Sequence, residues 1–343
     1  MSLMLNETQS IPAVLQHMLE DDSAVTALAD RLARNLPDLM ITVARGSSDH
    51  AAAYLAHLMM SQIGIPSLSI PLSLVSLNQP PLRLNNAWVA ALSQSGKSPD
   101  LIASVRYLKS RGARATALVN TPDSPLAAMA DGEVLLPAGL EQSVAATKSY
   151  VAMLMAAAQT VGHLERNLDM HPSGLLEALK ALPQQMERAV HADWSKAVEV
   201  LTPADKMLVI GRGPSLSIAQ EAALKLKETC GIQAEAFSSA EVKHGPMEII
   251  TKGYPILVFA PAGAEQAGTL AFAQEMRERG AKVLVAAAAD KEGVNLPTIQ
   301  TDHALLEPFT MIQSFYVLAE ALATARGCNP DKPHYLKKVT ETH

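Results

Sequence analysis

An internal repeat is the feature of this chain that most constrains its fold. The segment Met40–Ser48 resembles Met207–Ser215 at an offset of 207 − 40 = 167 residues. The segment Arg111–Arg114 resembles Arg279–Lys282 at an offset of 279 − 111 = 168 residues. Two matches at nearly the same offset indicate duplication of a whole domain rather than chance similarity. The length of 343 residues agrees with this, because one domain usually holds about 100–200 residues.

The two halves share one order of local patterns. A short apolar run, a Gly/Ser turn and an Ala-rich segment of helical length follow one another, which is typical of βαβ units. Strands that are apolar without alternation indicate a parallel sheet covered by helices on both faces. The sequence therefore predicts an α/β fold with two tandem domains, each a parallel sheet flanked by helices. The expected strands are 39–44, 88–92, 115–119, 133–136, 207–210, 255–259 and 282–286.

The expected boundaries divide the chain into five parts. Pro172 and Pro183 limit helix length in the stretch between the two halves, which we interpret as a helical connector. The parts are a lead (1–25), the first domain (26–166), the connector (167–195), the second domain (196–333) and a C-terminal tail (334–343).

Composition and charge exclude several classes of protein. Hydrophobic residues make up 48% of the chain, which argues against disorder, and the formal charge of −6 offers no long-range attraction for nucleic acid or an anionic membrane. Cys230 and Cys328 have no spacing typical of a disulfide framework or a zinc site. No signal peptide or membrane-spanning run is expected. The sequence predicts a cytoplasmic protein with no nucleic-acid or membrane partner and no metal.

Two serine-containing loops are the expected phosphate site. Ser93–Ser98 follows the strand 88–92 and precedes the helical pattern 99–110, and Gly46–Ser48 follows the first strand. Ligands bind at the carboxyl ends of parallel strands, where a helix N-terminus offers free N–H groups and a favourable dipole to an anion. Ser48 can instead serve as a helix N-cap. The absence of GxxxxGK[ST] and of a complete GxGxxG after the first strand argues against nucleotide binding.

A charged helix is the expected source of acid/base groups. The pattern predicts a helix over 215–230 that ends at Gly231. Glu221, Lys225 and Glu228 lie opposite its apolar stripe. In a lone subunit we expect this face to be merely solvated, with Glu–Lys pairs on its surface. The alternative is that another element or subunit covers the face and a carboxylate acts as a general base.

A single histidine lies on a rigid turn shortly after this helix. His244 is followed by Gly245 and Pro246, which restrict the backbone. A structural role is the simpler interpretation, but a titratable ring near a carboxylate helix is also a candidate acid/base group.

Several motifs, taken in order, resemble the isomerase half of the glucosamine-6-phosphate synthases in the sugar isomerase (SIS) domain family. The motifs are Ser93–Gly96, Glu141–Lys148, Ala222–Glu228, Ala234–Phe237, Glu241–Pro246 and Asp331–Val339. The similarity extends from about Thr42 to the end of the chain. The resemblance implies substrate-binding groups at Ser48, Ser93, Gln94, Ser95 and Ser98, a sugar-pocket residue at Val144, and Lys337 beside the reactive lysine.

The same resemblance implies catalytic roles. Glu228 corresponds to the isomerising base of the family, and Lys225 and Glu221 correspond to the residues that support this base. His244 corresponds to the ring-opening histidine, which in the family reaches the site from the neighbouring subunit. Lys338 corresponds to the lysine that forms a Schiff base in the family. The implied partner is therefore a second copy of the chain, in a homodimer with shared active sites, and the implied ligand is a phosphosugar.

Two departures from the synthases narrow the expected activity. Residues 1–41 contain no cysteine, so the glutamine-hydrolysing domain is expected to be absent. The loop Lys97–Asp100 lacks the acidic-threonine form of the synthases and resembles the stand-alone deaminases. We therefore expect an isomerising deaminase that converts glucosamine 6-phosphate to fructose 6-phosphate and ammonia without a cofactor.

Three alternatives to this activity stay open. One is another phosphosugar aldose–ketose isomerase, and a second is a deaminase of a fructosamine or galactosamine phosphate. The third is a phosphosugar-binding regulator, although residues 1–40 are too short and too acidic for a DNA-binding module.

Overall fold

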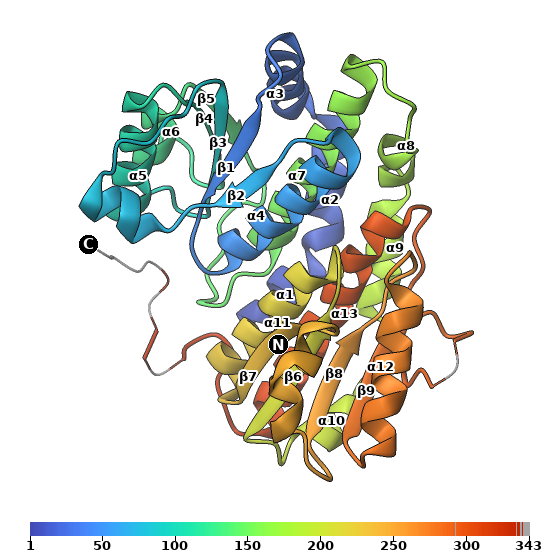
Figure 1. Cartoon of the computed structure of the whole chain (residues 1–343). Helices are drawn as coiled ribbons and strands as arrows, with labels where there is room; N and C mark the ends of the chain where they lie inside the picture. Colours follow the sequence, from blue (N-terminus) through green and yellow to red (C-terminus); the bar gives the residue numbers. More distant parts are fainter. Residues whose placement is uncertain (292, 334, 337, 339–343) are drawn as a thin grey trace. The chain divides into compact units, whose positions relative to one another are not determined.

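The computed structural model describes residues 1–291, 293–333, 335, 336 and 338, and these residues form two compact units (Figure 1). The sheet A unit comprises Ala13–Glu141, Lys148–Lys180 and Lys338. The sheet B unit comprises the described residues of Met1–Pro12, Gln142–Thr147 and Ala181–Leu336. Among the described residues, no helix is both long enough and apolar enough to cross a membrane.

The sheet A unit contains a five-stranded parallel sheet in the order β2-β1-β3-β4-β5 (Figure 1). The strands are β1 (Leu39–Val43), β2 (Ser67–Ser69), β3 (Ala87–Ser93), β4 (Arg114–Val119) and β5 (Gly132–Leu135). The helices are α2 (Ile11–Glu20), α3 (Ser23–Arg34), α4 (Ser47–Leu58), α5 (Pro99–Ser110), α6 (Pro125–Met129), α7 (Lys148–Asn167) and α8 (Leu175–Leu179). Two π-helical turns are η1 (Met59–Ile63) and η2 (Leu74–Asn78).

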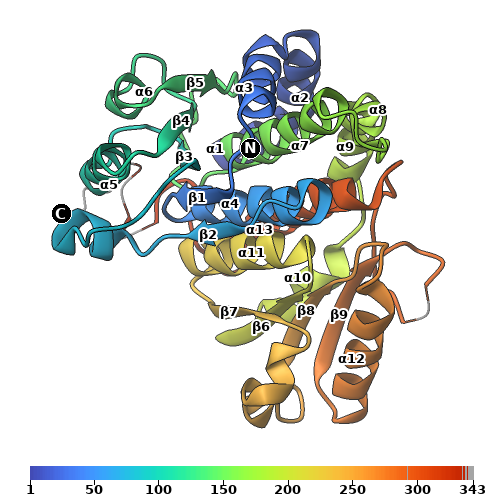
Figure 2. The same cartoon turned by 45° about the horizontal axis from the view of Figure 1, so that its top comes forward.

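The sheet B unit contains a second five-stranded parallel sheet in the order β7-β6-β8-β9-β10. Figure 2 shows β7, β6, β8 and β9 in this order. The strands are β6 (Lys206–Gly211), β7 (Gln233–Ser238), β8 (Pro255–Phe259), β9 (Lys282–Ala287) and β10 (Leu296–Pro297). The α-helices are α1 (Leu3–Gln9), α9 (Leu182–Val190), α10 (Ser195–Leu201), α11 (Ser215–Cys230), α12 (Gln266–Glu278) and α13 (Glu307–Ala325). The 3-10 turns are η3 (Glu241–His244), η4 (Pro246–Ile249) and η5 (Ala304–Leu306).

The identical strand orders confirm the predicted fold class. In both sheets the second strand of the domain lies at one edge, next to the first strand. The third, fourth and fifth strands follow in order on the other side of the first strand. The predicted strands all appear within a residue or two of their expected limits. The strands β2, β7 and β10 were not predicted, because they are edge strands that are either very short or only partly apolar and so lack the apolar run used to find the others.

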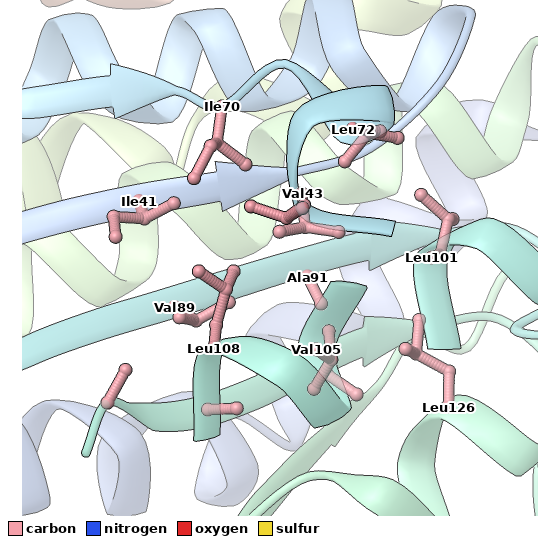
Figure 3. Packing of buried hydrophobic residues seen from close by; sticks show 14 of the residues in the cluster. Ile41, Val43, Ile70, Leu72, Val89, Ala91, Leu101, Val105, Leu108 and Leu126 are labelled. Atoms are coloured by element: carbon pink, nitrogen blue, oxygen red, sulfur yellow. The ribbon is translucent and has the colours of Figure 1, made fainter. Parts of the chain in front are cut away.

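The core of the sheet A unit explains why α5 forms where it does. Leu101, Val105 and Leu108 recur at helical spacing and lie on one face of α5. They pack against the sheet face that carries Ile41 and Val89 (Figure 3). Burying one such side chain stabilises the fold by about 1.5–3 kcal/mol. This packing fixes the helix at the carboxyl end of β3, and therefore fixes the loop between them.

Candidate functional site

The loop Ser93–Ser98 places three serine hydroxyls between β3 and the N-terminus of α5. The Ser93 hydroxyl accepts a hydrogen bond from the Gly96 N–H at 3.0 Å, and the Ser95 hydroxyl accepts one from the Lys97 N–H at 3.3 Å. Ser98 is the N-cap of α5, but its side chain accepts no capping hydrogen bond. Within the described residues, none of the three hydroxyls donates a hydrogen bond to a protein acceptor. Their protons are thus available to an anion at this helix N-terminus.

Gly96 holds this loop in a shape that other residues would disrupt. Its φ is +60°, and an added Cβ would lie 2.3 Å from the Ser124 hydroxyl. The Leu126 N–H donates to the Gly96 carbonyl at 3.0 Å, and the Asn120 N–H donates to the Gln94 carbonyl at 3.2 Å. The segment after β4 therefore anchors the loop from behind, and glycine is required for the close approach.

The second predicted loop follows β1 and leads into α4. Gly46, with φ of +55°, is the N-cap of α4, so the alternative in which Ser48 is the cap is wrong. Ser48 lies inside the first turn and is 9% exposed. The Arg45 guanidinium contacts the buried Asp100 carboxylate through Nε and Nη2, both at 3.0 Å. Because Asp100 belongs to the first turn of α5, this ion pair connects the two loops.

We expect Ser98→Ala to weaken binding of a phosphorylated sugar by about tenfold, the loss of about one hydrogen bond to a charged group. Protein stability should change little, because the Ser98 side chain makes no capping hydrogen bond. Isothermal titration with fructose 6-phosphate and thermal unfolding measure the two effects. Ser110→Ala, at the far end of the same helix, is the matched control. Equal affinity of Ser98→Ala and the parent for fructose 6-phosphate would show that the Ser98 hydroxyl does not bind the phosphate.

The corresponding loop of the sheet B unit is closed by an internal carboxylate. The loop after β8 is the counterpart of Ser93–Ser98, since β8 and β3 hold the same place in their sheets. Here the Ala262 N–H donates at 2.7 Å to the Glu307 carboxylate, which is 3% exposed. An N–H group that would bind an anion is thus already occupied. In the sheet A unit the Leu101 N–H likewise donates to the buried Asp100 carboxylate, at 2.9 Å, but the hydroxyls of Ser93, Ser95 and Ser98 remain as donors, so we expect a phosphate at the sheet A loop.

Burial raises the pKa of the Glu307 carboxyl above its ordinary value of 4.5, although the Ala262 hydrogen bond opposes this. A raised pKa in the folded state adds stability below the ordinary pKa, and that stability is lost as the pH rises through the folded value. Glu307→Gln keeps an acceptor for Ala262 and removes the buried charge. We expect the variant to gain stability relative to the parent as the pH increases from about 4 to 7. Urea unfolding across this range is the measurement; a constant difference would contradict it.

The charged face of α11 is buried in a single chain. Glu221 is 0% and Lys225 is 1% exposed. The Lys225 ammonium pairs with the Glu228 carboxylate and lies 3.5 Å from Glu221, which also accepts a hydrogen bond from the Tyr316 hydroxyl of α13 at 3.3 Å. The expectation that this face is merely solvated in a lone subunit is therefore wrong. Helical spacing shows which residues share a face, but not what packs on it.

Glu228 is the member of this cluster that reaches a cavity. Its side chain is 18% exposed, against 0% for Glu221, and it lines a cavity of about 530 Å³ together with Leu224 and Thr229 of α11. Much of the remaining wall is formed by Gly327, Cys328, Asn329, Lys332, Pro333, Tyr335 and Leu336. A carboxylate held on one side by an ammonium and open to a cavity on the other is suited to accept a proton from a bound carbon acid.

His244 is separate from this cluster. It is exposed at the end of η3, and within the described part of the chain it makes no hydrogen bond or ion pair. It therefore does not meet Glu228 through any contact of this chain. Lys337 lies outside the described residues.

The loop that carries Val144 is held from two directions in the sheet B unit. The Val144 N–H donates to the Asp331 carbonyl at 3.4 Å. The buried Glu7 carboxylate of α1 accepts hydrogen bonds from the N–H groups of Gln142 and Ser143. The Asp331 carboxylate in turn accepts from the first N–H groups of α1. These contacts fix the backbone on which Val144 is presented.

Sequence reasoning missed several residues that shape these sites. Arg45 belongs to the internal repeat, and Glu141 opens one of the recognised motifs, so both were visible without an assigned role. Asp100 belongs to the loop Lys97–Asp100 but was given no role of its own. Glu7 and Tyr316 gave no signal, because their importance arises from contacts with distant residues.

Two tandem five-stranded parallel sheets of identical strand order, each flanked by helices, define an α/β protein built from two similar domains. The SIS domain profile matches residues 38–161 and 200–325, and the chain belongs to the SIS domain family. A protein from Silicibacter pomeroyi, provisionally named a phosphosugar isomerase, has a structure with a TM-score of 0.90 and 37% identity, covering 96% of this chain and 100% of that one.

Relatives with more specific names are also similar. The C-terminal domain of glucosamine-fructose-6-phosphate aminotransferase from Francisella tularensis has a TM-score of 0.88 and 25% identity, covering 96% of this chain and 98% of that one. The isomerizing glutamine–fructose-6-phosphate aminotransferase of Symbiobacterium thermophilum is 36% identical over 309 residues, which is 86% of this chain and 50% of that protein. The chain spans about half the length of the curated relatives it matches.

Proposed function

We propose that this chain is an isomerising deaminase that converts glucosamine 6-phosphate to fructose 6-phosphate and ammonia. The observation that carries the proposal is Glu228, a carboxylate held by the buried Lys225 at the wall of a cavity. Membership of the SIS domain family supports a phosphosugar as the substrate. The proposed working unit is a homodimer.

The serine loops supply the anion site that such a substrate needs. The hydroxyls of Ser95 and Ser98 bind the phosphate at the N-terminus of α5, where the helix dipole favours an anion. The protein carries a formal charge of −6, so the phosphate must be held by local donors rather than by a general positive field.

The chemistry then proceeds by proton transfer on an open-chain sugar. His244, from a second subunit, assists opening of the ring. Glu228 takes the proton from C2, which is acidic because C1 is part of a carbonyl or imine group, and returns a proton to C1. The resulting C2 ketimine reacts with Lys338 or water and releases ammonia.

The fate of the amino nitrogen is the point on which the proposed deaminase activity and the names of the relatives differ. The loop Lys97–Asp100 supports a deaminase, because it resembles the stand-alone enzymes. The aminotransferase names of the relatives support the opposite direction, in which glutamine supplies nitrogen to fructose 6-phosphate. The same isomerising base serves both directions, so the products formed from each substrate distinguish the two activities.

An ammonia-release assay tests the proposal. The chain is incubated with glucosamine 6-phosphate, and ammonia and fructose 6-phosphate are measured as products formed in equal amounts. Galactosamine 6-phosphate, a fructosamine phosphate and unphosphorylated glucosamine form the comparison panel. Release from glucosamine 6-phosphate should be the fastest. Formation of glucosamine 6-phosphate from fructose 6-phosphate and glutamine, without ammonia release, would instead assign the aminotransferase activity; binding without turnover would assign a regulator.

A further inference from the structure

We propose that Glu141 accepts the ammonium proton of Lys338 and so provides the amine that attacks the substrate imine. The inference rests on the proposed function, because it assigns a chemical role within the same reaction. The Lys338 Nζ donates to Glu141 Oε2 at 3.0 Å. The Glu141 side chain is 0% exposed, whereas that of Lys338 is 25% exposed. The amine is therefore partly open to solvent, whereas the carboxylate that faces it is fully buried.

The surroundings of Glu141 hold its carboxylate in one orientation. The N–H of Ser149 donates to Oε1 at 3.2 Å, and the Ser149 hydroxyl donates to Oε2 at 2.6 Å. Ser149 is the second residue of α7, so the helix N-terminus also favours the negative charge. The other nearby cation, Lys148, donates to the Leu140 carbonyl at 2.7 Å rather than to Glu141. These contacts hold the Glu141 carboxylate with Oε2 facing Lys338.

A helix cap alone explains only part of this geometry. Ser149 accounts for the capping function, but not for an ammonium brought to the same oxygen from a position 197 residues away in the sequence. Burial of the Glu141 carboxylate disfavours its charged form, whereas the ammonium that faces it keeps part of its hydration. The 3.0 Å contact gives a direct route for a proton from Lys338 Nζ to Glu141 Oε2, and this transfer yields the nucleophilic amine.

The step balances in atoms and charge. The Lys338 ammonium gives one proton to the Glu141 carboxylate, and the free amine adds to the protonated C2 ketimine. A proton moves from the lysine nitrogen to the departing nitrogen, the C2–NH2 bond breaks, and ammonia leaves while a protonated imine to Lys338 remains. The Glu141 carboxylic acid returns its proton to ammonia, giving ammonium. Water then hydrolyses the imine to fructose 6-phosphate and the Lys338 ammonium.

Reductive trapping tests this role directly. The full chain is mixed with fructose 6-phosphate and sodium cyanoborohydride, which reduces an imine between C2 and a lysine to a stable amine detectable by mass spectrometry. The parent should carry one adduct, mapped to Lys338 and lost in Lys338→Arg. Glu141→Gln should trap at a rate lower by about tenfold or more, the effect of losing a general base. Its affinity for fructose 6-phosphate, measured by titration, should stay unchanged.

Matched variants separate proton transfer from helix capping. Ser149→Ala removes hydrogen bonds from the same carboxylate but leaves the carboxylate facing Lys338, so it should trap within about threefold of the parent. If Glu141→Gln does not fold, Glu141→Asp is used instead. Its side chain is shorter by one methylene, so its carboxylate lies farther from Lys338 and trapping should be slower than in the parent but faster than in a variant without a carboxylate. Parental trapping by Glu141→Gln or by Glu141→Asp overturns the inference.

Two further outcomes distinguish this inference from the proposed function. Absence of a Lys338 adduct in a parent protein that releases ammonia overturns the role of Glu141 and leaves the deaminase intact. A Lys338 adduct that depends on Glu141, in a protein that releases no ammonia, supports the inference and contradicts the deaminase. Weaker binding of fructose 6-phosphate by Glu141→Gln, in proportion to its slower trapping, overturns the inference because the effect then lies in binding.

Discussion

Glu228→Gln is expected to lower turnover of glucosamine 6-phosphate by about 10²-fold or more, because a positioned general base contributes about 10²–10⁴ to a proton-transfer step. Binding of the sugar phosphate should persist, because the side chains proposed to bind the phosphate lie in the loop Ser93–Ser98 and not at Glu228. The fold should persist as well. When Glu228 becomes neutral, Lys225 keeps Glu221 at 3.5 Å as a counter-charge and is not left as an isolated buried cation.

Steady-state kinetics with the ammonia assay measure this effect. Glu278→Gln, an exposed carboxylate at the end of α12, is the control and should behave like the parent. Glu221→Gln is the informative neighbour, because this side chain is fully buried and bonded to Tyr316, so its loss should appear mainly in stability. A Glu228→Gln protein that turns over within about threefold of the parent would leave Glu228 without a role in proton transfer.

Mixing two inactive proteins is expected to restore activity if the active sites are shared between subunits. Glu228→Gln lacks the base, and His244→Ala lacks the ring-opening group. A mixed dimer contains one site with both residues intact and one with neither. With free exchange and random pairing, activity should return to about one quarter of the parental value, since about half of the dimers are mixed and each has one working site.

The position of His244 motivates this experiment. His244 is exposed, and no contact in the described part of the chain joins it to Glu228. The buried charged face of α11 does not by itself require a second subunit, because Glu221 and Lys225 are already covered within one chain. Mass measurement must confirm that subunits have exchanged. Confirmed exchange without recovered activity would assign His244 to its own subunit or to no catalytic step.

The sequence alone determined the architecture and the limits of the central elements. The repeat offset of 167–168 residues predicted two similar sheets, and both have the same strand order. The helix predicted over 215–230 is α11, Ser215–Cys230, with Gly231 in the left-handed conformation at its end. Apolar runs and helix-ending glycines are local signals, because burial on both faces of a sheet and positive φ each select particular residue types.

Contacts between distant residues were decided only by the tertiary structure. Helical spacing placed Glu221, Lys225 and Glu228 on one face, but whether Tyr316 or water would cover that face depended on packing. The pairs of Arg45 with Asp100 and of Glu141 with Lys338 join positions 55 and 197 residues apart. No local pattern encodes such pairs, because their energy depends on burial and mutual orientation, which exist only once the chain has folded.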